Sequence, residues 1–190
     1  MKNQYKQYIN QISPLKEELV EILWKNFHPK SLHKNDFFVR EGAYANRIGF
    51  LYEGIVRAYF IDNNGKEYNK QFFVAPSIIG AYTSILTRQP NKIAQQALTN
   101  CQILVADFSS IESLYEQYHE FERLGRKIAE QYFLEKEKKE LEMALLDATQ
   151  RYLILRETFP KIETIISQRH IASYLSISQT QLSRIRKNMR

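Results

Sequence analysis

The chain has 190 residues, of which 44% are hydrophobic and 25% charged, and its formal net charge is +6 at pH 7. This length and composition exclude wholesale disorder and allow one large domain or two small ones. Cys101 is the only cysteine, which excludes a disulfide framework, a cysteine-based zinc site and a cysteine-ligated iron–sulfur cluster. The start of the chain lacks the apolar stretch of a signal peptide, and no run of about 18 apolar residues could span a bilayer. We therefore expect a cytoplasmic protein without membrane contact.

The positive charge is concentrated at the C-terminal end. Residues 164–190 contain no acidic residue and five basic ones, so the other 163 residues have a net charge of only +1. The five are Arg169, Arg184, Arg186, Lys187 and Arg190. This asymmetry indicates a small basic module that meets an anion.

The first predicted element is an amphipathic helix over residues 12–27. Its apolar residues have helical spacing, Ser13 is suited to cap the helix, and Pro14 fits the first helical position. Pro29 ends the pattern. We expect this helix to pack against the segment that follows.

Short β-prone runs separated by turn residues occupy residues 30–108. They are Phe37–Val39, Ile48–Tyr52, Ile55–Ile61, Tyr68–Val74 and Ala94–Phe108. Asp62-Asn63-Asn64-Gly65 is a hairpin signal, because Asn and Gly tolerate the positive φ of tight turns. The pattern predicts an antiparallel β-roll of the double-stranded β-helix or jelly-roll type, which together with the N-terminal helix forms a domain over residues 1–109.

Residues 110–147 form one long predicted helix of roughly 35 residues, about 50 Å in length. Its apolar stripe is too long to be covered within so small a domain, so we expect it to pair with the same helix of a second chain. The predicted contacts are Leu114, Tyr118, Phe121, Ile128, Leu141 and Leu145. The alternative is a helix that lies wholly across its own β-roll.

Residues 148–190 contain three shorter helical patterns, of which the last two are the most informative. Apolar residues lie on facing sides of segments 168–175 and 179–188, and Ala172 allows close approach. Ser178 and Gln181 have the spacing of a capping box at the start of the second helix. Two short helices with these features predict a helix-turn-helix.

The side chains on this module suit contacts with base edges and phosphates. The candidate DNA-binding residues are Arg169, His170, Ser178, Gln179, Thr180, Gln181, Ser183, Arg184 and Lys187. We expect the second helix to enter the major groove with its N-terminal half first. The alternative is a solvated helical hairpin, which the absence of acidic residues argues against.

This order of parts resembles the Crp/Fnr family of bacterial transcription regulators over essentially the whole chain. The resemblance is most specific in LDATQR (146–151), IASYLSIS (171–178) and LSRIRK (182–187), and extends to FLYEGIVR (50–57). It implies an α+β fold with an N-terminal helix, an antiparallel β-roll, a long dimerisation helix and a C-terminal helix-turn-helix.

The family's base-contacting positions fall on Gln179, Thr180 and Arg184, and only Arg184 keeps the usual residue of the catabolite activator. Ser176 occupies a turn position that is commonly Gly.

The resemblance also locates an effector pocket, but its residues differ from those of members that bind cyclic AMP. Ala81 replaces the carboxylate that follows a glycine in those members, and Asn91 and Lys92 replace an arginine and its hydroxyl neighbour. The pocket candidates are Gly80, Ala81, Tyr82, Asn91, Lys92 and Lys136. Because Lys lacks the planar fork of Arg, we expect no binding of cyclic AMP in the family manner. The sequence predicts no cofactor and no metal site.

The sequence thus predicts a homodimeric, sequence-specific DNA-binding transcription regulator that is not an enzyme. Its expected partners are double-stranded DNA and a second copy of itself, with RNA polymerase as a further candidate. Two alternatives remain open. The β-roll could serve mainly as a sensor that binds a small anion through Lys92 and the Gly80 loop, or as a module that binds a protein partner while DNA binding is weak.

Overall fold

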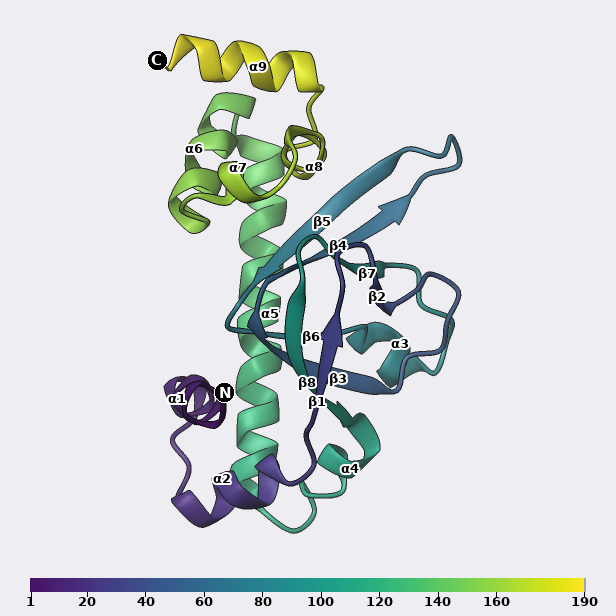
Figure 1. Ribbon diagram of the computed structural model, residues 1–190, viewed down its shortest axis with the longest axis vertical. Helices are drawn as coiled ribbons and strands as arrows, with labels where there is room; N and C mark the ends of the chain where they lie inside the picture. Colours follow the sequence, from purple (N-terminus) through teal and green to yellow (C-terminus); the bar gives the residue numbers. More distant parts are fainter. Residues whose placement is uncertain (190) are drawn as a thin grey trace.

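The computed structural model describes residues 1–189 as a mixed α+β fold in which a β-roll and a C-terminal group of helices lie along one long helix (Figure 1). The N-terminal part comprises α1 (Lys2–Ile12), α2 (Glu17–Trp24), β1 (His28–Leu32), β2 (Phe37–Val39), β3 (Arg47–Glu53), β4 (Ile55–Ile61), β5 (Glu67–Val74), β6 (Ser77–Gly80), α3 (Tyr82–Thr87), β7 (Ala94–Ala97) and β8 (Cys101–Asp107). The remainder comprises α4 (Phe108–Glu112), α5 (His119–Leu145), α6 (Ala148–Thr158), α7 (Ile162–Ile165), α8 (Gln168–Tyr174) and α9 (Gln179–Asn188).

The roll consists of two four-stranded antiparallel sheets. One has the strand order β1-β8-β3-β6 and the other β2-β7-β4-β5. Apolar side chains from both sheets form a common core that includes Leu51, Val56, Phe73, Ile79 and Ile103. The predicted antiparallel β architecture is therefore confirmed.

Four of the predicted runs correspond to β2, β3, β4 and β5, whereas the fifth run, 94–108, is divided into β7 and β8. β1 and β6 were not predicted. Four of the five β1 residues are exposed, and this strand includes Pro29, so it lacks the alternation that marks a half-buried strand.

The N-terminus differs from the prediction. Instead of one helix over residues 12–27 there are two, and Ser13 ends α1 rather than capping the next helix. α2 begins at Glu17 after an N-cap at Lys16. Helix α1 escaped prediction because it buries only Tyr5 and Ile9, too few apolar positions for a clear pattern.

The predicted long helix is also shorter than expected. α4 ends at Glu112, and a turn separates it from the 27-residue α5, which begins after an N-cap at Tyr118. Leu114 therefore lies in the turn. Leu114 and Phe121 are buried in their own chain, in a cluster with residues of α1 and α2.

The predicted dimer contacts accordingly differ in burial. Leu114 and Phe121 are buried in the cluster with α1 and α2, so the expectation that they contact a second chain is wrong. The reason is that helix α1, which was not predicted, packs against these apolar side chains within the same chain. Tyr118 and Ile128 are partly buried against the same cluster, and their contact with a second chain stays a prediction. Leu141 and Leu145 are exposed, by 54% and 75%.

The exposed apolar residues of α5 continue towards its C-terminal half. Leu134 is 61% exposed and precedes Leu141 by seven residues, and Leu145 follows four residues later. Residues at these spacings lie on one side of a helix. Leu141 and Leu145 are thus predicted dimer contacts that the chain itself leaves exposed, and Leu134, which was not predicted, extends them to a stripe of three exposed leucines.

We expect Phe121→Ala to lower the free energy of unfolding by about 3–5 kcal/mol, because deleting a buried aromatic ring leaves a cavity. The loss should be the same at low and high protein concentration, since Phe121 packs within one chain. Urea unfolding at two concentrations measures both quantities. As a control, Tyr44→Ala removes a 70% exposed ring and should change stability by less than about 0.5 kcal/mol.

Candidate functional site

The C-terminal helices α6 to α9 share a compact apolar core. Its fully buried members include Leu155, Ile171, Leu175 and Leu182. α8 and α9 are joined by a turn in which Ser176 has φ 55°, in the left-handed region. This conformation costs a residue other than Gly about 1 kcal/mol, which the packing of the two helices must offset. Ser176 therefore lies in the turn between α8 and α9, as the sequence predicts.

Helix α9 begins as the sequence indicated. The Ser178 hydroxyl accepts a hydrogen bond from the Gln181 backbone N–H at 3.1 Å. The reciprocal bond of the predicted capping box, from the Gln181 side chain, is not among the hydrogen bonds of residues 1–189. Unpaired backbone N–H groups at a helix start, together with the helix dipole, favour an anion there.

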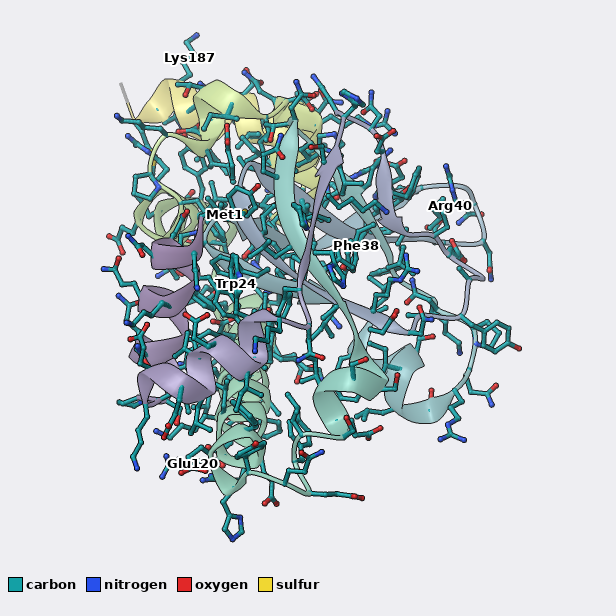
Figure 2. All side chains as sticks on the ribbon, turned by 60° about the horizontal axis from the view of Figure 1, so that its bottom comes forward. Met1, Trp24, Phe38, Arg40, Glu120 and Lys187 are labelled. Carbon is teal, nitrogen blue, oxygen red and sulfur yellow. The ribbon has the colours of Figure 1, made fainter. Side chains whose placement is uncertain are left out.

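One side of α9 is buried and the other is exposed. Leu182 and Ile185 pack into the helical core. Seven of the nine predicted DNA-binding residues are exposed at or on this helix: Ser178, Gln179, Thr180, Gln181, Ser183, Arg184 and Lys187. α9 lies at the end of the molecule farthest from α2 and α4 (Figure 1), and the Lys187 side chain points away from the body of the protein (Figure 2).

Arg186 is different from its neighbours on α9. Its side chain is only 28% exposed, and its Nε lies 3.3 Å from the Glu163 carboxylate. Arg156 on α6 approaches the same carboxylate at 3.5 Å. Arg186 therefore stabilises the helical group, whereas Arg184 is left exposed.

The remaining two candidates, Arg169 and His170, lie on α8 and face the roll. The half-buried His170 ring has its Nδ1 3.3 Å from the Arg57 guanidinium and 3.4 Å from the Asn69 amide. His170 was predicted to contact DNA, but its ring points to β4 and β5 and not to the outer face of α9. Arg169 is exposed, but its guanidinium lies 3.7 Å from the Glu67 carboxylate.

The contact between α8 and the roll is centred on Arg57, a buried cation with 4% exposure. Its guanidinium donates to Glu67 Oε2 at 2.7 Å and to Gln96 Oε1 at 2.7 and 3.0 Å. The guanidinium also lies 3.7 Å from the centre of the Tyr59 ring. The opposite charge of Glu67 and these hydrogen bonds offset the free-energy cost of burying the guanidinium.

Ser173 fixes α8 to the edge strand β5. Its hydroxyl donates to the Glu67 carbonyl at 2.8 Å and accepts from the Asn69 backbone N–H at 2.9 Å. The Asn69 side chain in turn donates to the His170 carbonyl at 3.1 Å. We call Arg57, Glu67, Asn69, His170 and Ser173 the interdomain cluster, because it joins the roll to the C-terminal helices.

The cluster changes the protonation of two of its members. Burial, reinforced by the Arg57 charge, lowers the pKa of His170 to about 4. The hydrogen bond from Arg57 lowers the pKa of Glu67, and its charge adds to this effect. Neutral His170 and ionised Glu67 are therefore the forms that the folded chain favours.

We expect stability to fall as the pH drops from about 6.5 to about 4. The unfolded chain takes up a proton at His170 near its ordinary pKa of 6.5, while the folded chain does so only near pKa 4. The lowered pKa of Glu67 acts in the same direction: its contribution is present above its ordinary pKa and is lost as the pH falls through the folded value. Urea unfolding at pH 7, 5.5 and 4.5 should show a smaller decline for His170→Gln than for wild type. Equal declines would contradict this.

A second feature is a cavity of about 1810 Å³ that extends from the roll along α5 to the C-terminal helices. All six effector-pocket candidates line it: Gly80, Ala81, Tyr82, Asn91, Lys92 and Lys136. The Asn91 amide is occupied by structural hydrogen bonds to the Arg40 and Ile93 carbonyls. Lys92 and Lys136 are exposed at the margin, and Ala81 contributes no polar side chain. Their role in binding stays a prediction.

The sequence analysis overlooked Gln95, which is buried and lines the same cavity. The signal was its position between Ala94 and Ala97 in a predicted β-prone run, because an amide that is buried in a strand requires a hydrogen-bond partner. It also overlooked Arg57, a charged residue in the otherwise apolar run of β4.

Residues 1–189 contain neither a candidate metal site nor a helix suited to span a membrane. No group of three or more His, Cys, Asp or Glu side chains is placed to hold a metal ion. In the same range, no helix combines the length and apolar character needed to cross a membrane. Cys101 is buried, and its thiol lies 3.5 Å from the Ile55 carbonyl.

Comparisons with known proteins support the fold. Residues 29–118 match the family described as the cyclic nucleotide-binding domain. No curated protein matches the chain. Among solved structures, the chain is similar to the c-di-GMP-responsive global regulator CLP of Xanthomonas campestris, with 16% identity, coverage of 92% of this chain and 91% of that chain, and a TM-score of 0.72.

Two further solved structures share the fold at similarly low sequence identity. FixK2 of Bradyrhizobium japonicum is 16% identical over 86% of this chain and 84% of that chain, with a TM-score of 0.75. A protein of Eubacterium rectale assigned to the Crp/Fnr family of transcriptional regulators is 12% identical over 90% and 82%, with a TM-score of 0.70. The chain thus has the α+β fold of these regulators, including a region that matches the cyclic nucleotide-binding domain.

Proposed function

We propose that this protein is a homodimeric, sequence-specific DNA-binding transcription regulator of Crp/Fnr type. The observation that carries the proposal is the exposed face of α9, which joins a capped helix start to polar and basic side chains with no acidic residue among them. α8 and α9 act as a helix-turn-helix in which α9 is the recognition helix. Its exposed Gln and Arg side chains are those that read adenine and guanine in the major groove.

The second part of the proposal is the dimer. Recognition helices read a near-palindromic site when two of them are held about one helical turn of DNA apart. The stripe of Leu134, Leu141 and Leu145 on α5 is exposed and apolar, and pairing with its counterpart would remove it from water. The shared fold with known regulators supports this arrangement.

The third part concerns the effector. We propose that the roll does not bind cyclic AMP in the family manner and needs no cofactor. Ala81 offers no carboxylate for a ribose hydroxyl, and the Asn91 amide is engaged by the backbone. Lys92 could attract an anion only as a point charge. The protein acts by binding DNA and not by catalysis, and RNA polymerase is its candidate protein partner.

DNA binding is tested by titrating the full chain with selected and random duplexes at several salt concentrations. We expect Arg184→Ala to weaken binding to a selected site by about 1–3 kcal/mol and to relax the preference at one base pair. Lys187→Ala should weaken binding to all sequences and reduce the salt slope by about 1.

Arg186→Ala is the matched control on the same helix, because its guanidinium pairs with Glu163. It should lower stability while leaving the base preference unchanged. Salt-independent binding, or a wild type that does not bind duplex DNA at all, would refute the proposed function.

The dimer is tested with Leu141→Glu, which places a charge in the centre of the exposed stripe. We expect the variant to sediment as a monomer and to lose most of its affinity for a two-half-site duplex, because each half-site is then bound independently. Leu86→Glu on α3 is the control, since Leu86 is 56% exposed and lies outside the stripe. A Leu141→Glu variant that remains dimeric would place the dimer contact elsewhere.

A further inference from the structure

The inner end of the cavity contains a buried hydrogen-bond acceptor that lacks a partner. Gln95 on β7 is only 4% exposed, and its Oε1 makes no hydrogen bond to any group in residues 1–189. Its Nε2 donates to the Gly80 carbonyl at 2.9 Å. Because a carbonyl oxygen can only accept, this bond fixes the orientation of the amide and leaves Oε1 as the unpaired atom. Burying an acceptor in this state costs free energy.

The strand register places this amide on the inner face of the roll. Ala58 on β4 is paired with Gln95 on one side and with Gln71 on β5 on the other, so the three side chains form a row across the sheet. Ala58 is small, and Gly80 on the opposite sheet has no side chain. All four residues line the cavity. The space beside the Gln95 amide is therefore bounded by small residues.

Several residues that line the cavity near this amide are apolar or already hydrogen-bonded. Phe73, Ile79 and Ile93 line the same cavity. The Ser84 hydroxyl donates to the Gln89 carbonyl at 2.6 Å and accepts from the Ala45 N–H. The Asn91 amide is likewise engaged, as described above. Gln71 in the same row is only partly buried. Gln95 Oε1 is therefore the fully buried polar atom at this end of the cavity that lacks a partner within residues 1–189, and it is an acceptor.

Two other residues that line the cavity also have buried polar atoms without partners, but they lie elsewhere. The Tyr5 hydroxyl belongs to the cluster under α1 and α2. Arg151 Nε is near the junction of α5 and α6, where the same guanidinium donates to the Leu146 and Leu175 carbonyls. Neither atom is part of the row formed by Gln71, Ala58 and Gln95.

We propose that this end of the cavity binds an uncharged, largely apolar small molecule that donates an N–H or O–H hydrogen bond to Gln95 Oε1. A phosphate or carboxylate oxygen would place one acceptor against another, so the site selects against anions. Apolar walls with a few positioned polar groups are the usual composition of a small-molecule site. The inference concerns the roll alone and does not require that the protein binds DNA.

The test uses the full chain and two probes of nearly equal shape. Indole carries one N–H donor, and N-methylindole carries none. We expect isothermal titration to show about tenfold tighter binding of indole, the usual size of one hydrogen bond to a buried acceptor. Gln95→Leu should reduce this ratio to about one. Gln117→Leu, an exposed glutamine in the turn before α5, should keep the wild-type ratio.

A second measurement covers the case in which Gln95→Leu does not fold. In ¹⁵N-labelled wild type, indole should shift the side-chain NH₂ resonances of Gln95 more than those of Gln117. Equal affinities for the two probes, or no saturable binding of either below about 1 mM, would overturn the proposal and leave buried water as the partner of Oε1. Duplex titration of the same sample is a separate readout, so failure here is distinguishable from failure of the proposed function.

Discussion

The arrangement of the molecule depends on one buried cation. Arg57 lies on the outer face of the β2-β7-β4-β5 sheet, where it would be costly to bury without partners. Glu67 neutralises its charge, and Gln96 together with the Tyr59 ring occupies the rest of the guanidinium. These partners hold the β4–β5 hairpin and β7 in register around the cation, and that surface is what α8 packs against.

The same interaction connects the two faces of the sheet. Gln95 and Gln96 are consecutive residues of β7, and their side chains point to opposite faces. Gln96 holds Arg57 on the outer face, beside α8, while Gln95 lines the cavity on the inner face. A displacement of β7 would therefore move Gln95 in the cavity and, at the same time, Gln96 and its contact with Arg57 beside α8. The apolar contact of Phe72 with Tyr174, whose rings stack at 4.8 Å, extends the same surface.

The parts of this fold that depend on neighbouring residues could be predicted from the sequence, whereas those that depend on contacts between distant residues could not. The Asp62–Gly65 turn, the β-prone runs of β4 and β5 and the Ser178 cap are properties of a few neighbouring residues, and the structure contains each of them. Helix α1 is different, because its two buried residues pack against residues far along the chain. The centres of the Tyr5 and Phe50 rings, for example, lie 5.3 Å apart. The position of His170 likewise depends on Arg57, 113 residues earlier.

These long-range contacts also alter what the basic C-terminus can offer to DNA. Its charge excess suggested five cations per chain, but Arg169 lies near Glu67, and Arg186 pairs with Glu163 just outside the acid-free segment. Within the described residues, Arg184 and Lys187 are the cations left on the outer face of α9. Two cations release few counterions, so one chain alone would bind phosphate weakly. A second copy doubles that number and adds a second reading helix, which is why the exposed leucine stripe of α5 matters as much to the proposed function as α9 itself.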